Sequence, residues 1–425
     1  MLDISKLRNN FEEISKRIRT RNRPYEQLDE FKLIDTKWRK ATTQLQKLNA
    51  DRNALSNQIG ELIKNNKITE VNKIKTKVQK LKIRIEKLSI QQAKLDKQLK
   101  EIVFSIPNIP DKSVPLGKDE NDNVEIRKWG EPTKFDFKPL THWELAEKLD
   151  LADFERASKL SGSRHTVFKK DGAKLLRAIR DFTLDMHVKK ASYIELQPPV
   201  LINPDILYGT GHLPKSKEDM FETMNGQFLS PTEEVPLTGY YRNEIIDEKQ
   251  LPIHLTASTV SFRSEAGSAG KDVRGVIRQH QFYNTEMVCI CKPEQSMDEL
   301  EKMTSECEAV LKALEIPYRV ITLCTGDMGS AAIKTYDVEV WFPCNEKYRE
   351  ISSCSNCDDY QARGSMIKYR DSKTKKTEFV HTLNGTGTSL NRLWVAIIEN
   401  YQLHDGSIRI PDKLRKYFDN QEFIK

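Results

Sequence analysis

Residues 262–286 bring together an arginine, a glycine-rich stretch and a series of polar and aromatic side chains that could bind a nucleotide. The pattern predicts a strand that ends at Arg263, a loop, and a returning strand. On the returning strand Arg278, Phe282 and Glu286 have the same parity, so we expect their side chains on one face. Arginine binds phosphate oxygens through its planar fork, an aromatic ring stacks on a purine, and a carboxylate accepts hydrogen bonds. Each residue alone is more typical of an ion pair or a core, whereas the whole set indicates a nucleotide site.

Two heptad patterns predict the element that precedes this region. In each, apolar residues alternate four and three apart, and the pattern is interrupted only by Arg52 in the first and Gln92 in the second. The first comprises Ile34, Trp38, Ala41, Leu45, Leu48, Leu55, Ile59 and Leu62, and the second Val71, Ile74, Val78, Leu81, Ile85, Leu88, Leu95, Leu99 and Ile102. A polar turn at 65–67 joins them. We therefore expect an antiparallel helical hairpin with arms about 50 Å long, ended by Pro107 and Pro110.

Positive charge is concentrated on this hairpin. Residues 31–104 contain 18 Lys and Arg against 7 Asp and Glu, a net charge of +11, while the whole chain carries +7. An elongated cationic rod suits the phosphate backbone of a structured RNA. The alternative, more common for a long coiled coil, is a solvated surface that binds a partner protein.

Length and composition limit the class of protein. A chain of 425 residues can hold a large core and one appended module. The longest apolar runs fall short of the roughly 18 residues that cross a bilayer, and residues 1–6 lack the features of a signal peptide or presequence. The seven cysteines are odd in number and confined to 289–357, which favours a reducing compartment. We expect a cytoplasmic protein with neither a membrane nor DNA as a partner.

After a polar linker at 107–123 the heptads give way to a mixed α/β pattern. Runs at 251–262, 276–290 and 338–342 are rich in β-branched or aromatic residues and predict strands, with amphipathic helices between them. This region has no internal repeat. We expect it to form a second large domain, of the α+β class.

The sequence as a whole resembles the class II aminoacyl-tRNA synthetases, and among them the seryl-tRNA synthetases of the bacterial type. Residues 262–282 are similar to the motif 2 loop of this class, residues 384–392 to motif 3, and residues 193–201 to motif 1, which forms the dimer interface in this class. The Thr232-x-Glu234 segment resembles the serine-binding motif, and residues 350–353 resemble the acidic segment near ATP. The resemblance implies a helical hairpin domain at 1–110 and, at 111–425, a catalytic domain built on an antiparallel β-sheet flanked by helices.

The resemblance also implies roles for individual residues. Arg263 and Arg392 are the expected catalytic residues, with Arg263 on the α-phosphate and the serine carboxylate and Arg392 on the γ-phosphate. Glu265 would bind the adenine amino group, Phe282 would stack on the ring, and Glu350 and Ser353 would coordinate Mg²⁺. The ATP-binding set is Arg263, Ser264, Glu265, Arg278, Phe282, Glu350, Ile351, Ser352, Ser353 and Arg392. The serine-binding set is Thr232, Glu233, Glu234, Arg263, Glu286 and Thr386, with Glu286 and Thr386 on the amino group and hydroxyl.

The implied activity is the activation of L-serine by ATP to seryl-adenylate and pyrophosphate, followed by transfer of serine to the 3′ end of tRNA(Ser). Use of tRNA(Sec) is left open. A homodimer is expected, with the hairpin of one subunit serving a tRNA bound by the other. Two alternatives are an RNA-binding protein that has lost catalysis and a ligase that loads a carrier protein. The complete set of site residues argues against the first, and the basic hairpin against the second.

Several residues are less informative or depart from the family pattern. Cys354-x-x-Cys357 is a weak zinc signal without a second pair, so we expect no structural zinc. The role of His280 is left open between lining the site and supporting it. Asn391 and Ser192 stand where the family usually has glycine, which puts the local geometry in doubt but not the class of activity.

Overall fold

A computed structural model of the chain describes residues 1–23, 25–266 and 274–425. It divides into two compact units: one comprises Met1–Arg23 together with Pro107–Lys425, and the other is Pro24–Ile106. The first 23 residues thus belong to the large unit. The domain limits expected from the sequence, 1–110 and 111–425, divide the chain by function, and they stay a prediction.

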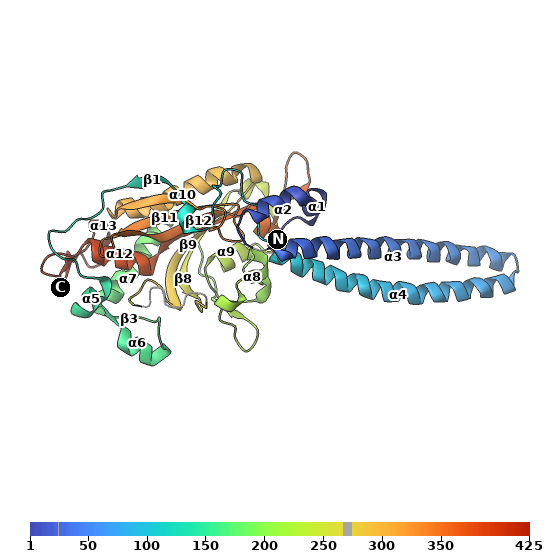
Figure 1. Ribbon diagram of the computed structural model, residues 1–425, viewed down its shortest axis with the longest axis horizontal. Helices are drawn as coiled ribbons and strands as arrows, with labels where there is room; N and C mark the ends of the chain where they lie inside the picture. Colours follow the sequence, from blue (N-terminus) through green and yellow to red (C-terminus); the bar gives the residue numbers. More distant parts are fainter. Residues whose placement is uncertain (24, 267–273) are drawn as a thin grey trace. The chain divides into compact units, whose positions relative to one another are not determined.

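The small unit is a hairpin of two long helices, α3 (Glu26–Lys64) and α4 (Ile68–Ser105), which run antiparallel in Figure 1. The turn between them contains Asn66 with φ of +56°. Gln92, the polar residue in the second heptad pattern, donates from its side chain to Thr42 Oγ1 of the facing helix at 3.3 Å. The predicted antiparallel coiled-coil hairpin is confirmed.

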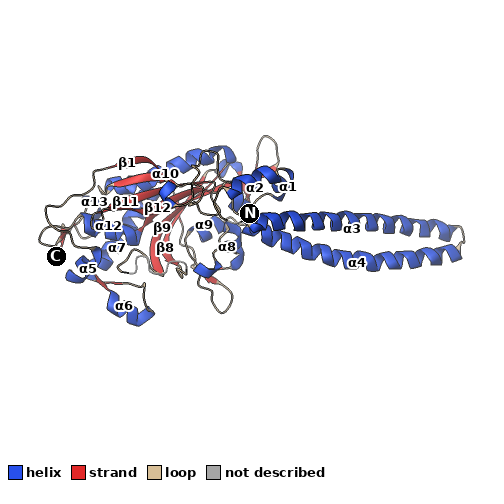
Figure 2. Cartoon of the chain, in the orientation of Figure 1, coloured by secondary structure: helices blue, strands red, loops and turns tan. Residues whose placement is uncertain are grey.

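The large unit is built on an eight-stranded sheet whose order is β1-β10-β11-β12-β15-β9-β8-β4. All neighbouring strands are antiparallel except β4 and β8. In chain order the strands are β1 (Val124–Trp129), β4 (Ile194–Glu195), β8 (Ile253–Phe262), β9 (Gln281–Cys291), β10 (Tyr318–Thr322), β11 (Lys334–Phe342), β12 (Lys347–Asn356) and β15 (His381–Ser389). The expected antiparallel sheet flanked by helices is confirmed (Figure 2).

Helices cover the sheet and shorter strand pairs complete the unit. The helices are α1 (Ile4–Asn9), α2 (Phe11–Arg19), α5 (His142–Lys148), α6 (Phe154–Ser161), α7 (Lys170–Asp185), α8 (Pro204–Thr210), α9 (Glu234–Gly239), α10 (Ser296–Ala313), α11 (Tyr360–Ser365), α12 (Leu390–Asn400) and α13 (Asp412–Arg415). The remaining strands are β2 (Ala152–Asp153), β3 (Val167–Phe168), β5 (Leu201–Ile202), β6 (Phe228–Leu229), β7 (Ile245–Asp247), β13 (Lys368–Arg370), β14 (Thr377–Phe379), β16 (Ile408–Arg409) and β17 (Phe423–Ile424). None of the helices described is long and apolar enough to span a bilayer.

Helix α12 forms the centre of the core. Ten of its residues are buried, including Trp394, whose indole N–H donates to the carbonyl of Gly172 on α7 at 3.0 Å. A helix that is apolar on nearly every side is stable only when its neighbours surround it. The position of Arg392, in its first turn, is therefore fixed by the packing of the whole core.

A buried arginine attaches the N-terminal residues to the same unit. The Arg21 guanidinium is 3% exposed and donates to the carbonyls of Asn108, Gly329 and Ala332 at 3.0, 3.1 and 2.5 Å. A buried cation needs such partners, because each lost hydrogen bond leaves charge in an apolar surrounding. This contact explains why residues 1–23 belong to the large unit.

Candidate active site

Two neighbouring cavities share Arg278 in their linings. One lies along β1, β10, β11 and β12 beside the first turn of α12, and the other lies next to Arg263, which directly follows β8. The larger has a volume of about 950 Å³ and the smaller about 380 Å³, and Arg278 lines both. The larger is lined by Glu120, Asn121, Asn123, Glu125, Ile277, Arg278, Arg319, Ile321, Glu339, Trp341, Glu346, Lys347, Tyr348, Arg349, Glu350 and Arg392. The smaller is lined by His212, Ser216, Asp219, Met220, Pro231, Arg263, Glu265 and Arg278.

Three arginines act on Glu350, which lines the larger cavity. Arg392 Nη1 lies 3.1 Å from Glu350 Oε2 and donates to the Glu350 carbonyl at 2.6 Å. The nearby Arg392 guanidinium is the main cause that lowers the pKa of Glu350, and the charges of Arg263 and Arg278 act in the same direction. The structure therefore brings together the two arginines that the sequence predicts to be catalytic, with Arg278 beside them.

Arg263 follows directly after β8, lines the smaller cavity, and carries a charge that acts on the buried Glu286. Its Nε donates to the Pro231 carbonyl at 3.2 Å, and its guanidinium lies 5.2 Å from the centre of the Phe282 ring. The ring of Phe282, predicted to stack on adenine, is thus in contact with the arginine predicted to hold the α-phosphate. An arginine against an aromatic face keeps its planar orientation.

The beginning of the motif 2-like loop is fixed by hydrogen bonds. Ser264 donates from its backbone to Asp219 O at 2.9 Å and from its hydroxyl to Glu218 O at 2.6 Å. Glu265 has φ of +55°, and its Oε2 lies 3.3 Å from Arg278 Nη1. The middle of the loop, residues 267–273, lies outside the described part of the chain. Glu265 and Arg278 therefore lie together in the lining of the smaller cavity, and Ser264 directly precedes them in the loop.

The position of Arg278 corrects one prediction. We expected Arg278, Phe282 and Glu286 on one face of a single strand, but β9 begins only at Gln281. The chain from 275 to 279 is irregular, because side chains take the hydrogen bonds of its backbone: Gln279 Nε2 donates to Gly275 O at 2.9 Å and Val276 N donates to His142 Nε2 at 3.3 Å. Phe282 and Glu286 are on β9 as expected, whereas Arg278 reaches the cavities from the loop.

Glu233, Glu234 and Glu286 form a group of acids, called the acidic pocket below, in which the charges of Glu233 and Glu234 act on Glu286. Glu286 is 2% exposed, and its Oε2 accepts from Thr386 Oγ1 at 3.1 Å. The two residues are direct partners in the β9–β15 ladder. Glu233 is 1% exposed and accepts from Thr259 at 2.7 Å and from Ser261 at 3.2 Å. Each carboxylate can accept more hydrogen bonds than these hydroxyls donate.

Burial controls the protonation of this pocket. It raises the pKa of Glu233 to about 7 against the hydrogen bonds of Thr259 and Ser261. The pKa of Glu286 is raised well above its ordinary value, first by burial and then by the charges of Glu233 and Glu234. The arrangement suits a ligand that brings a positive charge, since a cation would allow the acids to ionise.

Glu234 is held by residues that sequence reasoning missed. Gln361 Nε2 donates to Glu234 Oε1 at 2.6 Å, and His212 Nε2 lies 3.8 Å from Glu234 Oε2. Burial lowers the pKa of His212, which also lines the smaller cavity. Thr232 Oγ1 accepts from the Glu234 backbone at 3.2 Å. His212 and Gln361 come from separate segments with no common spacing, so nothing in the sequence pattern signals them.

In the segment 350–353 on β12, Glu350 lines the larger cavity, whereas Ile351 and Ser352 are buried. Ile351 and Ser352 are each 1% exposed, so a contact of either with ATP would have to use the backbone, and their assignment stays a prediction. Ser353 is paired in register with Asp337 on β11. Asp337 was not predicted; its pKa is raised well above the ordinary value by burial and by the charge of Glu350. Among the described residues, its Oδ1 is a buried oxygen without a hydrogen-bond partner.

The cysteines of the possible zinc signal contact different partners. Cys354 Sγ lies 3.5 Å from Cys307 Sγ, while Cys357 Sγ accepts from Asn384 at 3.4 Å. Cys344 Sγ donates to the Leu140 carbonyl at 3.0 Å. In the described part of the chain these cysteines do not belong to any group of potential ligands, and the one such group is His254, Cys289 and Glu299.

His280 and Asn391 support the site from outside the cavities. His280 Nδ1 lies 3.0 Å from the Arg263 carbonyl, and the ring contacts His165 at 5.4 Å between centroids. Asn391 is 2% exposed, and its Oδ1 accepts from the backbone of Tyr283 at 2.9 Å. His280 is therefore a supporting residue, and Asn391 attaches the first turn of α12 to β9.

Two family models match the chain and define the class of protein to which it belongs. The model of the "tRNA synthetase class II core domain (G, H, P, S and T)" matches residues 221–401, and that of the "Seryl-tRNA synthetase N-terminal domain" matches residues 1–110. The mostly antiparallel sheet and these matches define a class II aminoacyl-tRNA synthetase.

The relatives narrow this to one family. The chain is 49% identical to a serine–tRNA ligase of Malacoplasma penetrans (strain HF-2), over 98% of each chain. It resembles the seryl-tRNA synthetase of Pyrococcus horikoshii solved with ATP, with a TM-score of 0.94 and 36% identity over 100% of this chain and 99% of that one. For the cytoplasmic serine–tRNA ligase of Naegleria fowleri in complex with AMP, the TM-score is 0.89 at 26% identity, over 100% and 99%. The chain belongs to the seryl-tRNA synthetase family.

The activity follows from this membership. The chain is an ATP-dependent aminoacyl-tRNA ligase that joins serine to tRNA. The alternatives of a non-catalytic RNA-binding protein and a carrier-protein ligase are set aside.

Proposed function

We propose that Arg263 and Arg392 hold the two ends of the reacting assembly during serine activation. Arg392 binds the γ-phosphate in the larger cavity, and Arg263 holds the α-phosphate together with the serine carboxylate where the cavity meets the acidic pocket. Their common effect on Glu350 supports this arrangement. Fixing the two reactants in line lowers the barrier of a transfer whose transition state needs little covalent help from the protein.

The adenine is bound by the residues around the entrance of the smaller cavity. Phe282 stacks on the ring after the Arg263 guanidinium has turned toward phosphate, and Glu265 accepts from the adenine amino group. Arg278, 3.3 Å from Glu265, orients that carboxylate and contributes charge to both cavities. Ser264, Ile351 and Ser352 complete the ATP set through backbone or supporting contacts.

The acidic pocket selects serine. Its ammonium group is received by Glu286 and Glu234, with Glu233 behind them, and its hydroxyl by the polar pair of Glu286 and Thr386. The 3.1 Å contact between Thr386 and Glu286 supports this assignment, because the same donor and acceptor can bond to a hydroxyl between them. Alanine and glycine leave these groups unpaired, whereas threonine has to be excluded by shape, so threonine is the harder competitor.

Oxygen atoms of Glu350, which lines the larger cavity, and of two nearby residues fit Mg²⁺. Glu350, Ser353 and the unpaired Oδ1 of Asp337 offer the hard ligands that this ion prefers. Bound there with ATP, Mg²⁺ would neutralise phosphate charge. The role of the chain's own residues is to orient the triphosphate, with Arg392 released from Glu350 as the phosphates arrive.

The helical hairpin binds tRNA(Ser) through its phosphate backbone. The net charge of +11 on residues 31–104 and the length of the antiparallel helices α3 and α4 suit recognition of RNA by shape and charge. Whether tRNA(Sec) is charged too depends on the same surface. The cytoplasm, where seven free thiols are kept reduced, is the proposed location.

A homodimer forms through the motif 1-like segment. Ile194, Leu201 and Tyr240 are 54%, 47% and 59% exposed, around an apolar groove of about 360 Å³ that includes Pro198 and Pro199. A contiguous exposed apolar surface of this kind is typical of protein interfaces. Replacing Tyr240 by lysine should shift the mass measured by light scattering from dimer to monomer.

The division of labour between the units can be tested by deletion. We expect that removing residues 35–103 spares serine-dependent ATP–pyrophosphate exchange and abolishes serylation of tRNA. Exchange measured with serine, alanine, glycine and threonine should be strong for serine and weakest for alanine and glycine. Equal loss of exchange and serylation in the deletion variant would contradict the proposal.

A further inference from the structure

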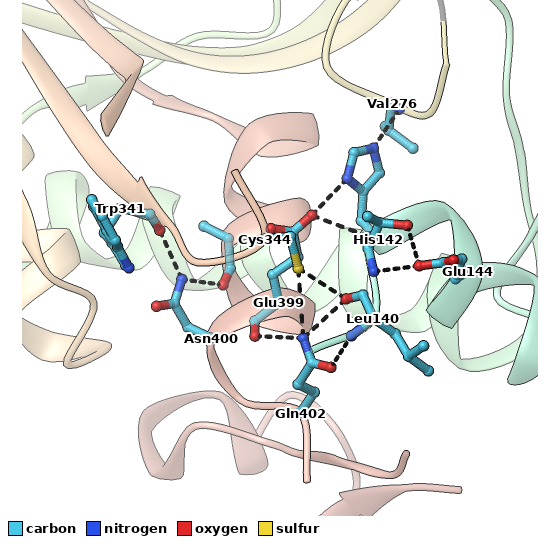
Figure 3. A network of polar contacts seen from close by, with 11 residues as sticks. Leu140, His142, Glu144, Val276, Trp341, Cys344, Glu399, Asn400 and Gln402 are labelled. Carbon is cyan, nitrogen blue, oxygen red and sulfur yellow. Dashed lines mark hydrogen bonds and ion pairs between the residues drawn. The ribbon is translucent and has the colours of Figure 1, made fainter. Parts of the chain in front are cut away.

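His142, the first residue of α5, joins two parts of the active site from outside it. Its side chain is fully buried and lies between the motif 2-like loop and helix α12 in Figure 3. On one side its Nε2 accepts from the backbone N–H of Val276 at 3.3 Å. On the other, its Nδ1 and its backbone N both contact Glu399 Oε1, at 2.8 and 3.0 Å. No role in the reaction has been assigned above to His142, Glu399 or Val276.

The hydrogen bonds fix the tautomer of the imidazole. A backbone N–H can only donate, so Nε2 carries no proton when Val276 is bonded to it. The proton therefore lies on Nδ1 and is donated to Glu399 (Figure 3). One neutral ring thus satisfies a buried backbone donor of the loop and a buried carboxylate of the helix, and both partners would otherwise lose a hydrogen bond in the core.

The loop passes so close to the ring that its position is closely specified. Gly275 has φ of +81°, and a β-carbon there would lie 1.9 Å from His142 Nε2. Four residues further on, Gln279 accepts from Thr166 at 3.0 Å. The stretch between these two anchors is short and contains Arg278, which lines both cavities.

The other anchor belongs to the helix that carries Arg392. Glu399 lies seven residues after Arg392 on α12, about two helical turns. Because α12 is buried along its length, a constraint at its end is transmitted to its first turn. The ring of His142 therefore connects the elements that bear Arg278 and Arg392, two of the four arginines that line the larger cavity.

We propose that His142 is a positioning residue for ATP: it sets the placement of Arg278 relative to Arg392 by bonding to the loop at Val276 and to α12 at Glu399. The proposal rests on the ATP site proposed above. We expect His142 to affect the binding of ATP and not that of serine. In the described residues, the proposed serine ligands Glu286, Thr386 and Glu234 make no contact with His142 or its two partners.

Two substitutions separate the two bonds of the ring. Asparagine has its amide nitrogen at the δ position, so His142→Asn can still donate to Glu399 but leaves Val276 without an acceptor. Glutamine reaches the ε position with a carbonyl oxygen, so His142→Gln can accept from Val276. The fold should survive both changes, because Leu140 and Gln402 also attach the start of α5 to the end of α12, with Leu140 N to Gln402 Oε1 at 2.7 Å.

Kinetics of ATP–pyrophosphate exchange test the proposal. We expect His142→Asn to raise KM for ATP about tenfold while KM for serine stays within about twofold, and His142→Gln to restore most of the ATP affinity. His254→Asn is the matched control: His254 also pairs with a glutamate, Glu299 at 2.7 Å, but lies at the other end of β8 from Arg263, so KM for ATP should not change.

A double-mutant cycle with Arg278→Ala checks the mechanism. If His142 acts through the loop, His142→Asn should add little to the rise in KM for ATP that Arg278→Ala already causes. Additive effects, or a parallel rise of both KM values in His142→Asn, would overturn the proposal. Failure of the ATP site itself would be seen separately, as an unchanged KM for ATP in Arg392→Ala.

Discussion

Thr386 Oγ1 lies 3.1 Å from Glu286 Oε2, and the two residues face each other on adjacent antiparallel strands. In the described residues, Thr386 is the only hydroxyl donor to this buried carboxylate. Its position is set by the register of the β9–β15 ladder, so Thr386 cannot shift unless β15 slips against β9. This fixed pair is the part of the pocket best suited to distinguish a hydroxylated amino acid.

Replacing Thr386 by valine should reduce selectivity for serine over alanine. Valine keeps the shape but loses the hydroxyl, so Glu286 is left with an unpaired buried oxygen and serine with one partner fewer. We expect kcat/KM for serine to fall by about 10²-fold, while that for alanine changes little. The comparison of Thr386→Val with Thr386→Ser in pyrophosphate exchange measures this. Equal losses in both variants would show that the hydroxyl is not used.

Binding of serine should release protons near neutral pH. Burial and neighbouring acids raise the pKa of Glu286, and burial raises that of Glu233 to about 7, so the empty pocket retains protons. The serine ammonium favours the ionised acids, and we expect release of about one proton. Affinity should therefore increase from pH 6 to pH 8. Calorimetry in buffers of different ionisation enthalpy gives the number of protons, and a value of zero would contradict the protonated pocket.

The raised pKa of Glu233 also predicts how the free energy of unfolding depends on pH. The pKa of Glu233 is about 7 in the folded protein against 4.5 for an ordinary glutamate, so between these values the folded state binds more protons than the unfolded state. The free energy of unfolding should fall as pH rises from 4.5 through 7, by on the order of 3 kcal/mol from this group. Glu233→Gln cannot ionise, so its pH dependence should be flatter. Parallel curves for the two proteins in urea denaturation would disprove this.

Asn391 should be needed for stability although the family usually has glycine at this position. Its Oδ1 accepts from the buried backbone of Tyr283 at 2.9 Å. Asn391→Ala leaves that N–H without its partner, and we expect a loss of about 1–3 kcal/mol in the free energy of unfolding. The denaturation midpoint measures it. A change below about 0.5 kcal/mol would mean that water or a small shift replaces the bond.

Much of the fold could be predicted because its sequence signals are local. The heptads of α3 and α4 depend on spacing alone, and even Gln92, the exception in the pattern, bonds across the hairpin. The strands β8 and β11 follow from β-branched and aromatic residues. The packing of residues 1–23 on the large unit had no such signal, since it depends on Arg21 meeting carbonyls more than 300 positions away.

The candidate site was predicted where residues lie on regular strands and missed where side chains bend the backbone. Phe282 and Glu286 are on β9 as their spacing indicates, but the chain departs from the strand before Arg278. The His280 N–H donates to the Arg164 carbonyl at 3.0 Å, and the Gln279 side chain donates to the Arg278 carbonyl at 3.4 Å. The backbone conformation of Ser192 could not be predicted from the residue type. Its φ is +61°, a conformation that favours the glycine it replaces.

Arg263 is the residue proposed to lie where the nucleotide and the amino acid meet, and serine activation should depend on it most. Rapid-quench measurement of seryl-adenylate formation at saturating ATP and serine tests it directly, with Arg263→Lys, which keeps the charge but loses the planar fork. We predict a fall of at least about 10²-fold in the rate constant, because the carboxylate and the α-phosphate are no longer held in line. Adenylate formation by Arg263→Lys at the rate of the unaltered protein would contradict the account.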